Sequence, residues 1–332
     1  MKRFILIILC CIPLITHTGC DKNVYPISAT EFMLDTVITV TVYDGDGSAL
    51  RGALELCKQY ENLLSKTVKT SDIYKINHSG GMPTEVNPET VELLNTALNI
   101  AAKSNGAFDP TVLPLVTLWD VQNRTFPPCV ADIKDKLNYV NYNNIIISQN
   151  TVTAQGGAQL DLGGIAKGFI ADRIKEYLKV NGVTSGVINL GGNTLLIGNK
   201  NGSDFTVGLQ KPFGKNGELS ATLELTDKTA VTSGIYQRYF EADGKIYHHI
   251  IDPYTGYPCD NGIASVTVIT ESSCIADGLS TACLNLGIEK GIELAKQYGA
   301  ELIYITASGE LILTDGLIKT YKDNRLFVCL KT

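Results

Sequence analysis

The sequence predicts an α+β fold, built as one compact unit with two lobes. The 332 residues, of which 44% are hydrophobic and 19% charged, are enough for a sizeable buried core. The first hundred residues carry two long helical patterns. Beyond residue 140, short apolar segments broken by Gly, Asn and Asp are typical of strands. Strands and helices grouped in this way favour an α+β architecture.

The N-terminus predicts a secretory signal over residues 1–19. Lys2 and Arg3 precede an apolar run from Phe4 to Ile15, which is too short to span a bilayer comfortably. We therefore expect the protein to be exported.

Cys20 follows Gly19 and resembles the lipid-attachment cysteine of bacterial lipoproteins. An ordinary cleaved signal is the alternative. The lipoprotein interpretation predicts a protein anchored to the bacterial membrane through Cys20 and facing the periplasm. Residues 20–30 would then be a lipidated tether, and residues 31–332 the functional domain.

The first half of the domain predicts one strand and two helices. Thr36 to Tyr43 alternates Val or Ile with Thr, the pattern of a half-buried strand. Apolar residues recur at helical spacing from Ala49 to Leu64. A second helix is expected from Pro88 to about Ser104, with Asn87 as its N-cap.

The second half predicts mostly strands, with helices near residues 165–180 and 274–298. The formal net charge of −6 gives no electrostatic reason to expect nucleic acid as a partner. A bound phosphate must therefore be held by local donors or by a metal.

A first candidate motif runs from Leu160 to Gly168. Its Gly163-Gly164 turn leads into a helix, so a phosphate could approach the backbone and the N–H groups at the helix start. Lys167 could add a positive charge. Taken alone, the segment is equally a tight turn with an exposed lysine.

A second candidate is the pair Asp277 and Thr281, which are spaced to lie on one face of a helix. A carboxylate and a hydroxyl are the hard oxygen ligands that Mg²⁺ prefers. The alternative is that Asp277 caps its own helix and Thr281 bonds back to a carbonyl.

Two further segments carry polar or aromatic groups. His248 and His249 are adjacent on a predicted strand, so at most one of them faces a given site. The other segment, Gly106 to Thr111, places an aromatic ring beside an acid and precedes the only tryptophan, Trp119. It could hold a flat ring, or it could be an ordinary connection with a buried Phe.

Together, and in this order, these segments resemble the ApbE family of FAD:protein FMN transferases. The resemblance extends from Phe32 to about Leu313. Besides the segments above, it rests on Asn189 to Asn193, Thr232 to Gly234, His249 to Gly256, and Ser265 to Val268.

The resemblance implies an ApbE-type two-lobed fold with mixed sheets and flanking helices, and FAD bound between the lobes. It implies cleavage of FAD, release of AMP, and attachment of FMN by a phosphoester bond to a threonine of a target protein. The family's targets are subunits of membrane redox complexes, such as the sodium-translocating NADH:quinone reductase and the Rnf complex. Periplasmic hydrolysis of FAD to FMN and AMP, and non-catalytic FAD binding by a lipoprotein, are the alternatives.

The resemblance also implies roles for single residues. Mg²⁺ would be held by Asp277, Thr281 and the carbonyl of Gly164, with Ser280 nearby. His249 is a candidate for proton handling or phosphate contact, and Asp277 is the other candidate catalytic residue. FAD would contact the following residues: Leu34, Ala107, Phe108, Asp109, Asp161, Lys167 and Ile251.

Two positions depart from the family pattern. Leu34 stands where the family usually has Met, and a leucine can still pack against a ring. Thr67 stands where an aromatic residue is common, in a loop that helps to decide between transfer and hydrolysis.

Overall fold

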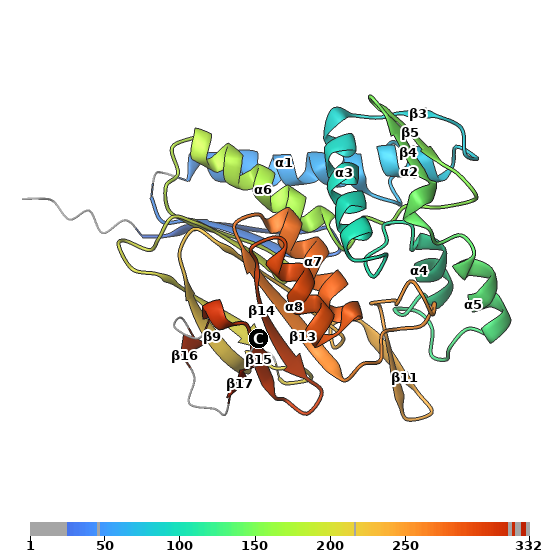
Figure 1. Ribbon diagram of the computed structural model, residues 1–332. Helices are drawn as coiled ribbons and strands as arrows, with labels where there is room; N and C mark the ends of the chain where they lie inside the picture. The colour runs from blue at the N-terminus through green and yellow to red at the C-terminus, as the bar shows by residue number, and fades with distance from the viewer. Residues whose placement is uncertain (1–24, 45–46, 216, 318–320, 323–326, 330–332) are drawn as a thin grey trace, which may run out of the picture.

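The computed structural model describes residues 25–44, 47–215, 217–317, 321–322 and 327–329 (Figure 1). The predicted signal and Cys20 lie outside these residues. No helix in the described part of the chain is long and apolar enough to cross a membrane.

A nine-stranded sheet forms the centre of the molecule, in the order β1-β2-β6-β7-β10-β13-β14-β15-β17. All neighbouring strands are antiparallel except the β15–β17 pair, which is parallel. The strands are β1 Ile27–Met33, β2 Thr36–Val42, β6 Gly186–Leu190, β7 Asn193–Ile197, β10 Thr229–Gly234, β13 Ile263–Thr270, β14 Glu301–Thr306, β15 Leu311–Leu313 and β17 Phe327–Cys329.

Helices cover one face of this sheet, with α6 packed against both α1 and α7 (Figure 1). They are α1 Ser48–Leu64, α6 Ala166–Val180, α7 Ser273–Leu286 and α8 Ile288–Lys296, and α3 Pro88–Lys103 packs against α7. Along β14, Leu302 and Tyr304 pack into the core under the helices, whereas Ile303 and Ile305 belong to a second core on the opposite face. This alternation explains why the central strands are apolar on both sides.

A three-stranded sheet contributes to the core on the opposite face. Its strands are β8 Phe205–Gln210, β9 Leu219–Leu225 and β16 Tyr321–Lys322, in the order β16-β9-β8. Phe205 and Leu223 of this sheet belong to the same apolar cluster as Ile303.

The smaller lobe is built from the segment between α1 and α6 together with a hairpin. It contains α2 Asp72–Asn77, α4 Leu113–Trp119, α5 Val130–Leu137, the sheet β3 Thr84–Glu85, β5 Thr151–Ala154 and β4 Ile145–Ser148, and the hairpin β11 Tyr239–Ala242 and β12 Lys245–His248. Ile73 and Val152 belong to the same core cluster as Ile38 of β2, whereas Trp119, Ile133 and Phe240 belong to a separate, smaller cluster of this lobe.

The α+β prediction is confirmed, and so is the strand predicted from residue 36. The Asn87 cap is confirmed as well, because its side chain accepts a hydrogen bond from the Glu89 N–H. The tether prediction is wrong for residues 27–30, because this segment pairs with β2 as part of the edge strand β1.

The single helix expected over residues 274–298 is wrong. It is two helices, α7 and α8, that break at Gly287, where φ is 80°. Glycine adopts this left-handed backbone at little cost and ends a helix there.

Candidate active site

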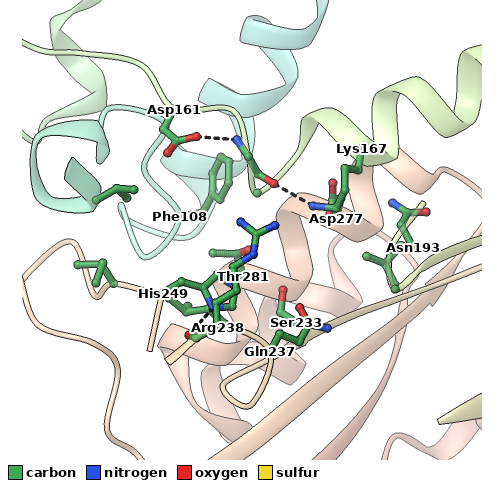
Figure 2. Close-up of a pocket in the computed structure, with 18 of the residues that line it drawn as sticks. Phe108, Asp161, Lys167, Asn193, Ser233, Gln237, Arg238, His249, Asp277 and Thr281 are labelled. Carbon is green, nitrogen blue, oxygen red and sulfur yellow. Dashed lines mark hydrogen bonds between the residues drawn. The ribbon is translucent and has the colours of Figure 1, made fainter. Parts of the chain in front are cut away.

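A cavity of about 670 Å³ opens where the helix layer, the central sheet and the smaller lobe meet (Figure 2). Residues from distant segments line it: the β1–β2 turn, the loop after α3, the turn before α6, the β6–β7 turn, the loop after β10, the segment after β12, and α7. All the site residues predicted from the sequence line this cavity except Ser280.

The Gly163-Gly164 turn is held by its neighbours. The Asp161 carboxylate accepts a hydrogen bond from the Gly163 N–H at 2.9 Å, and Lys167 Nζ donates to the Gly163 carbonyl at 3.1 Å (Figure 2). Lys66 Nζ lies 2.5 Å from the other oxygen of Asp161. The turn is therefore fixed from both sides before any ligand binds.

Asp277 lies on α7 and faces the start of α6. Its Oδ2 accepts a hydrogen bond from the Gly168 N–H at 2.9 Å, which leaves Oδ1 without a hydrogen bond in the described part of the chain. Burial raises the pKa of Asp277, and the nearby Lys167 charge opposes that rise. A positive partner for this carboxylate would therefore be strongly favoured.

Thr281 lies one helical turn after Asp277, as predicted. Its hydroxyl forms no hydrogen bond with any described residue, and a Cβ placed on Gly164 would stand 3.2 Å from Thr281 Oγ1. The Gly164 backbone thus lies directly against this hydroxyl, an approach that a residue with a side chain would obstruct.

The alternative that Asp277 caps its own helix is wrong. Ser272 caps α7 by accepting a hydrogen bond from the Ile275 N–H, while Asp277 bonds to α6 instead. Ser280 is fully buried and lies behind the cavity wall. Its hydroxyl donates to the Asp277 carbonyl at 2.8 Å and lies 2.7 Å from the Ser233 hydroxyl. Ser280 is therefore a structural residue of α7, whereas Thr281 lines the cavity.

The two adjacent histidines face different surroundings, as the sequence predicts. His248 is buried, and its Nε2 bonds to the Cys259 carbonyl at 2.8 Å, whereas His249 lines the cavity. Nδ1 of His249 lies 3.3 Å from the Arg238 carbonyl, which can only accept a hydrogen bond. Nδ1 therefore carries the proton of the neutral ring, and Nε2 forms no hydrogen bond with any described residue.

Burial and the charge of Arg238 lower the pKa of His249 to about 3. His249 is thus neutral near pH 7, with an unprotonated ring nitrogen. A neutral imidazole can accept a hydrogen bond from a hydroxyl nucleophile, and a pKa of about 3 makes it a weak base for the proton of that hydroxyl.

The loop after α3 forms the aromatic end of the cavity. Phe108 is almost fully buried and lines the cavity (Figure 2). The Asp109 carboxylate accepts hydrogen bonds from the N–H and hydroxyl of Thr111 and from the Tyr142 N–H. Asp109 therefore uses both of its oxygens to order the loop that carries Phe108.

Asn285 joins two segments for which the sequence predicted contacts with the flavin. Its side-chain amide donates to the carbonyls of Ala107 at 2.9 Å and Ile251 at 3.2 Å. Because this amide crosses from α7 to two loops far away in sequence, nothing in the sequence pattern predicted it.

Several polar residues of the cavity wall were not predicted from the sequence. Asn193 and Ser233 belong to segments that carried the family resemblance, and that signal could have identified them. Gln237 and Arg238 lie outside the segments on which the family resemblance rested. The missed residues are the following: Lys66, Asn193, Ser233, Gln237, Arg238 and Asn285.

A sequence profile of the ApbE family matches residues 34–304. The chain is 36% identical over 300 residues to an FAD:protein FMN transferase of Klebsiella pneumoniae, covering 89% of this chain and 93% of the relative. It is 33% identical over 337 residues to an FAD:protein FMN transferase of Treponema pallidum, covering 94% of this chain and 93% of the relative.

Solved structures agree with this comparison. The fold matches the ApbE protein of Thermotoga maritima with a TM-score of 0.84 and 30% identity, over 90% of this chain and 100% of that one. It matches the flavin transferase ApbE of Vibrio cholerae with a TM-score of 0.80 and 25% identity, over 89% of this chain and 99% of that one. The sequence and the fold lead to the same conclusion: this chain belongs to the ApbE family.

Proposed function

We propose that this protein is an FAD:protein FMN transferase, which cleaves FAD, releases AMP and attaches FMN by a phosphoester bond to a threonine of an acceptor protein. One observation carries the proposal. One cavity brings together the Phe108 ring, Lys167 and Oδ1 of Asp277 near a glycine turn, and the His249 ring. Neither Oδ1 of Asp277 nor Nε2 of His249 has a hydrogen-bond partner among the described residues. Its volume of about 670 Å³ is in the range of cofactor pockets.

Mg²⁺ fits the oxygen atoms on the α7 side of the cavity. Oδ1 of Asp277 and the hydroxyl of Thr281 have no hydrogen-bond partner among the described residues, and Gly164 lies against Thr281. No group of three His, Cys, Asp or Glu in the described part of the chain could hold a metal by itself. One carboxylate, a hydroxyl and the Gly164 carbonyl suit a magnesium ion that shares ligands with phosphate. When bound, Mg²⁺ would neutralise charge on the pyrophosphate.

The chain's own residues supply position and proton transfer. The loop carrying Phe108 holds the flavin end of FAD, with Leu34 and Ile251 as further apolar contacts. Lys167 lies beside the glycine turn, where the pyrophosphate would bind. The acceptor threonine attacks phosphorus in line, and its proton passes to Nε2 of His249 as AMP leaves. Phosphoryl transfer of this kind depends mainly on positioning and charge neutralisation.

Location and partners extend the proposal. A lipid anchor at Cys20 would hold the enzyme on the periplasmic side of a bacterial membrane. Subunits of the sodium-translocating NADH:quinone reductase or of the Rnf complex are the proposed acceptors. The sequence resemblance and the signal-like N-terminus support these assignments.

Purified protein incubated with FAD, Mg²⁺ and a candidate acceptor subunit tests the function directly. We expect the mass of the subunit to increase by one FMN, an equal amount of AMP to appear, and both to stop when a chelator is added. AMP and free FMN with an unmodified acceptor would identify a hydrolase instead. A stable FAD complex without AMP would identify a carrier.

A further inference from the structure

We propose that Arg238 binds the FAD pyrophosphate and neutralises charge on it as AMP departs. This inference rests on the flavin-transfer function proposed above and assigns a phosphate-binding role to a residue in the loop between β10 and β11.

Three cationic side chains line the described part of the cavity, and only one of them has no strong partner. Lys66 pairs with the Asp161 carboxylate at 2.5 Å, and Lys167 donates to the Gly163 carbonyl at 3.1 Å. Arg238 makes one long hydrogen bond, of 3.5 Å from Nη2 to the Asp35 carbonyl, and no ion pair with a described residue. A guanidinium has five N–H donors, so most of those of Arg238 remain available.

The backbone of Arg238 is fixed while its side chain reaches into the cavity. Its carbonyl accepts hydrogen bonds from the His249 N–H at 3.1 Å and from Nδ1 of the same residue at 3.3 Å. Figure 2 shows the guanidinium directed toward the middle of the cavity, in the space between Phe108 and Asp277. The charge of Arg238 also contributes to the lowered pKa of His249, which agrees with a guanidinium close to the imidazole.

The chemistry of the reaction calls for such a cation. The threonine oxygen forms a bond to the flavin-side phosphorus, and the bond from that phosphorus to the bridging oxygen breaks. The electron pair of the broken bond leaves with AMP, so negative charge grows on the departing phosphate. A planar guanidinium can donate two parallel N–H bonds to phosphate oxygens. Because the chain is acidic overall, with a net charge of −6, this attraction must come from local groups.

The test compares Arg238→Met and Arg238→Lys with the wild-type protein, and uses Arg51→Met as the matched control. Arg51 is exposed on α1 and does not line the cavity. For each full-length protein we would measure kcat and KM for FAD at saturating acceptor. We would also measure the affinities of ADP and adenosine for the free enzyme, and the thermal unfolding midpoint.

We expect Arg238→Met to lower kcat/KM about a hundredfold, in the range for loss of one donor to a developing anion. The kcat/KM of Arg238→Lys should lie between those of the wild type and Arg238→Met. An ammonium keeps the positive charge but cannot donate two parallel N–H bonds. ADP should bind about tenfold more weakly to the Met variant, while adenosine binds as to wild type. If the Met variant does not fold, the kcat/KM and the ADP and adenosine affinities of Arg238→Lys test the proposal instead.

Two results would overturn the proposal: kcat/KM and ADP affinity within twofold of wild type, or an equal loss of ADP and adenosine affinity, which would mean a purely structural role. The ADP comparison needs no turnover. If the wild-type protein transfers no FMN, the proposed function fails, yet the binding data still decide whether Arg238 recognises phosphate.

Discussion

Asp172 on α6 and Asp277 on α7 bond to each other's helix start in opposite directions. The Asp172 carboxylate accepts hydrogen bonds from the N–H groups of Ser273 and Cys274 and from the Ser272 hydroxyl, all within 2.9 Å. In return, Asp277 accepts a hydrogen bond from the Gly168 N–H, also at 2.9 Å. These reciprocal bonds fix the glycine turn before α6 against the Asp277–Thr281 pair of α7.

Replacing Asp172 by Ala should destabilise the protein by about 2–3 kcal/mol. The substitution leaves two N–H groups at the start of α7 without their acceptor, and both of those groups are shielded from water. Chemical denaturation measures the free energy of unfolding. The control is Asp135→Ala on the exposed surface of α5, which should cost less than about 0.5 kcal/mol. Equal stability of the two variants would contradict the capping role.

Gly168→Ala should separate α6 from α7 and lower activity. A Cβ at this position would stand 2.1 Å from the Ser273 carbonyl oxygen and 2.8 Å from Cβ of Asp277. Since the first contact is with backbone, the helices must shift, at a cost of about 1–3 kcal/mol. The exposed Lys179→Ala on the same helix is the control. A fully active, fully stable Gly168→Ala enzyme would show that the close approach is not needed.

Asp277→Asn should remove metal-dependent activity while the fold survives. The amide oxygen of Asn can still accept from the Gly168 N–H, whereas the negative charge is lost. Asp277→Ala leaves that N–H unpaired and should also cost about 1–3 kcal/mol of stability. Calorimetry with Mg²⁺ and ADP measures metal binding apart from turnover. Unchanged Mg²⁺ affinity in the Asn variant would assign the metal elsewhere.

His249→Gln should change how stability depends on pH. Burial and Arg238 lower the pKa of His249 to about 3 in the folded protein, against roughly 6.5 in the unfolded chain. Between these values the unfolded chain binds the extra proton, so acidification from pH 6.5 toward pH 3 destabilises the fold. Through this group the free energy of unfolding changes by at most about 1.4 kcal/mol per pH unit.

In the His249→Gln variant this contribution disappears, so its unfolding free energy should fall less steeply below pH 6.5 than that of wild type. Urea denaturation at several pH values measures the difference, with His78→Gln outside the cavity as control. The variant should also lose flavin transfer at pH 7, because glutamine cannot accept the threonine proton. Parallel stability profiles would show that the imidazole is not held neutral by the fold.

Local signals in the sequence predicted much of the architecture. The alternation in β2 and the Asn87-Pro88 start of α3 depend only on neighbouring residues, so they are readable without a tertiary structure. The spacing of Asp277 and Thr281 placed both on one face of α7 for the same reason. The edge strand β1 was missed because its Thr and Glu residues carry little apolar pattern.

The sequence by itself determined the α+β class, the family and eleven of the residues that line the cavity, because ordered motifs and short-range periodicity record them. Only the tertiary structure decided how those residues act together. Lys66 pairs with Asp161 across 95 positions, and Asn285 reaches Ala107 across 178. Such contacts depend on strand order and on how closely helices pack, and neither leaves a periodic trace in the chain. For this reason the buried position of Ser280 and the entry of Arg238 into the cavity emerged only from the folded molecule.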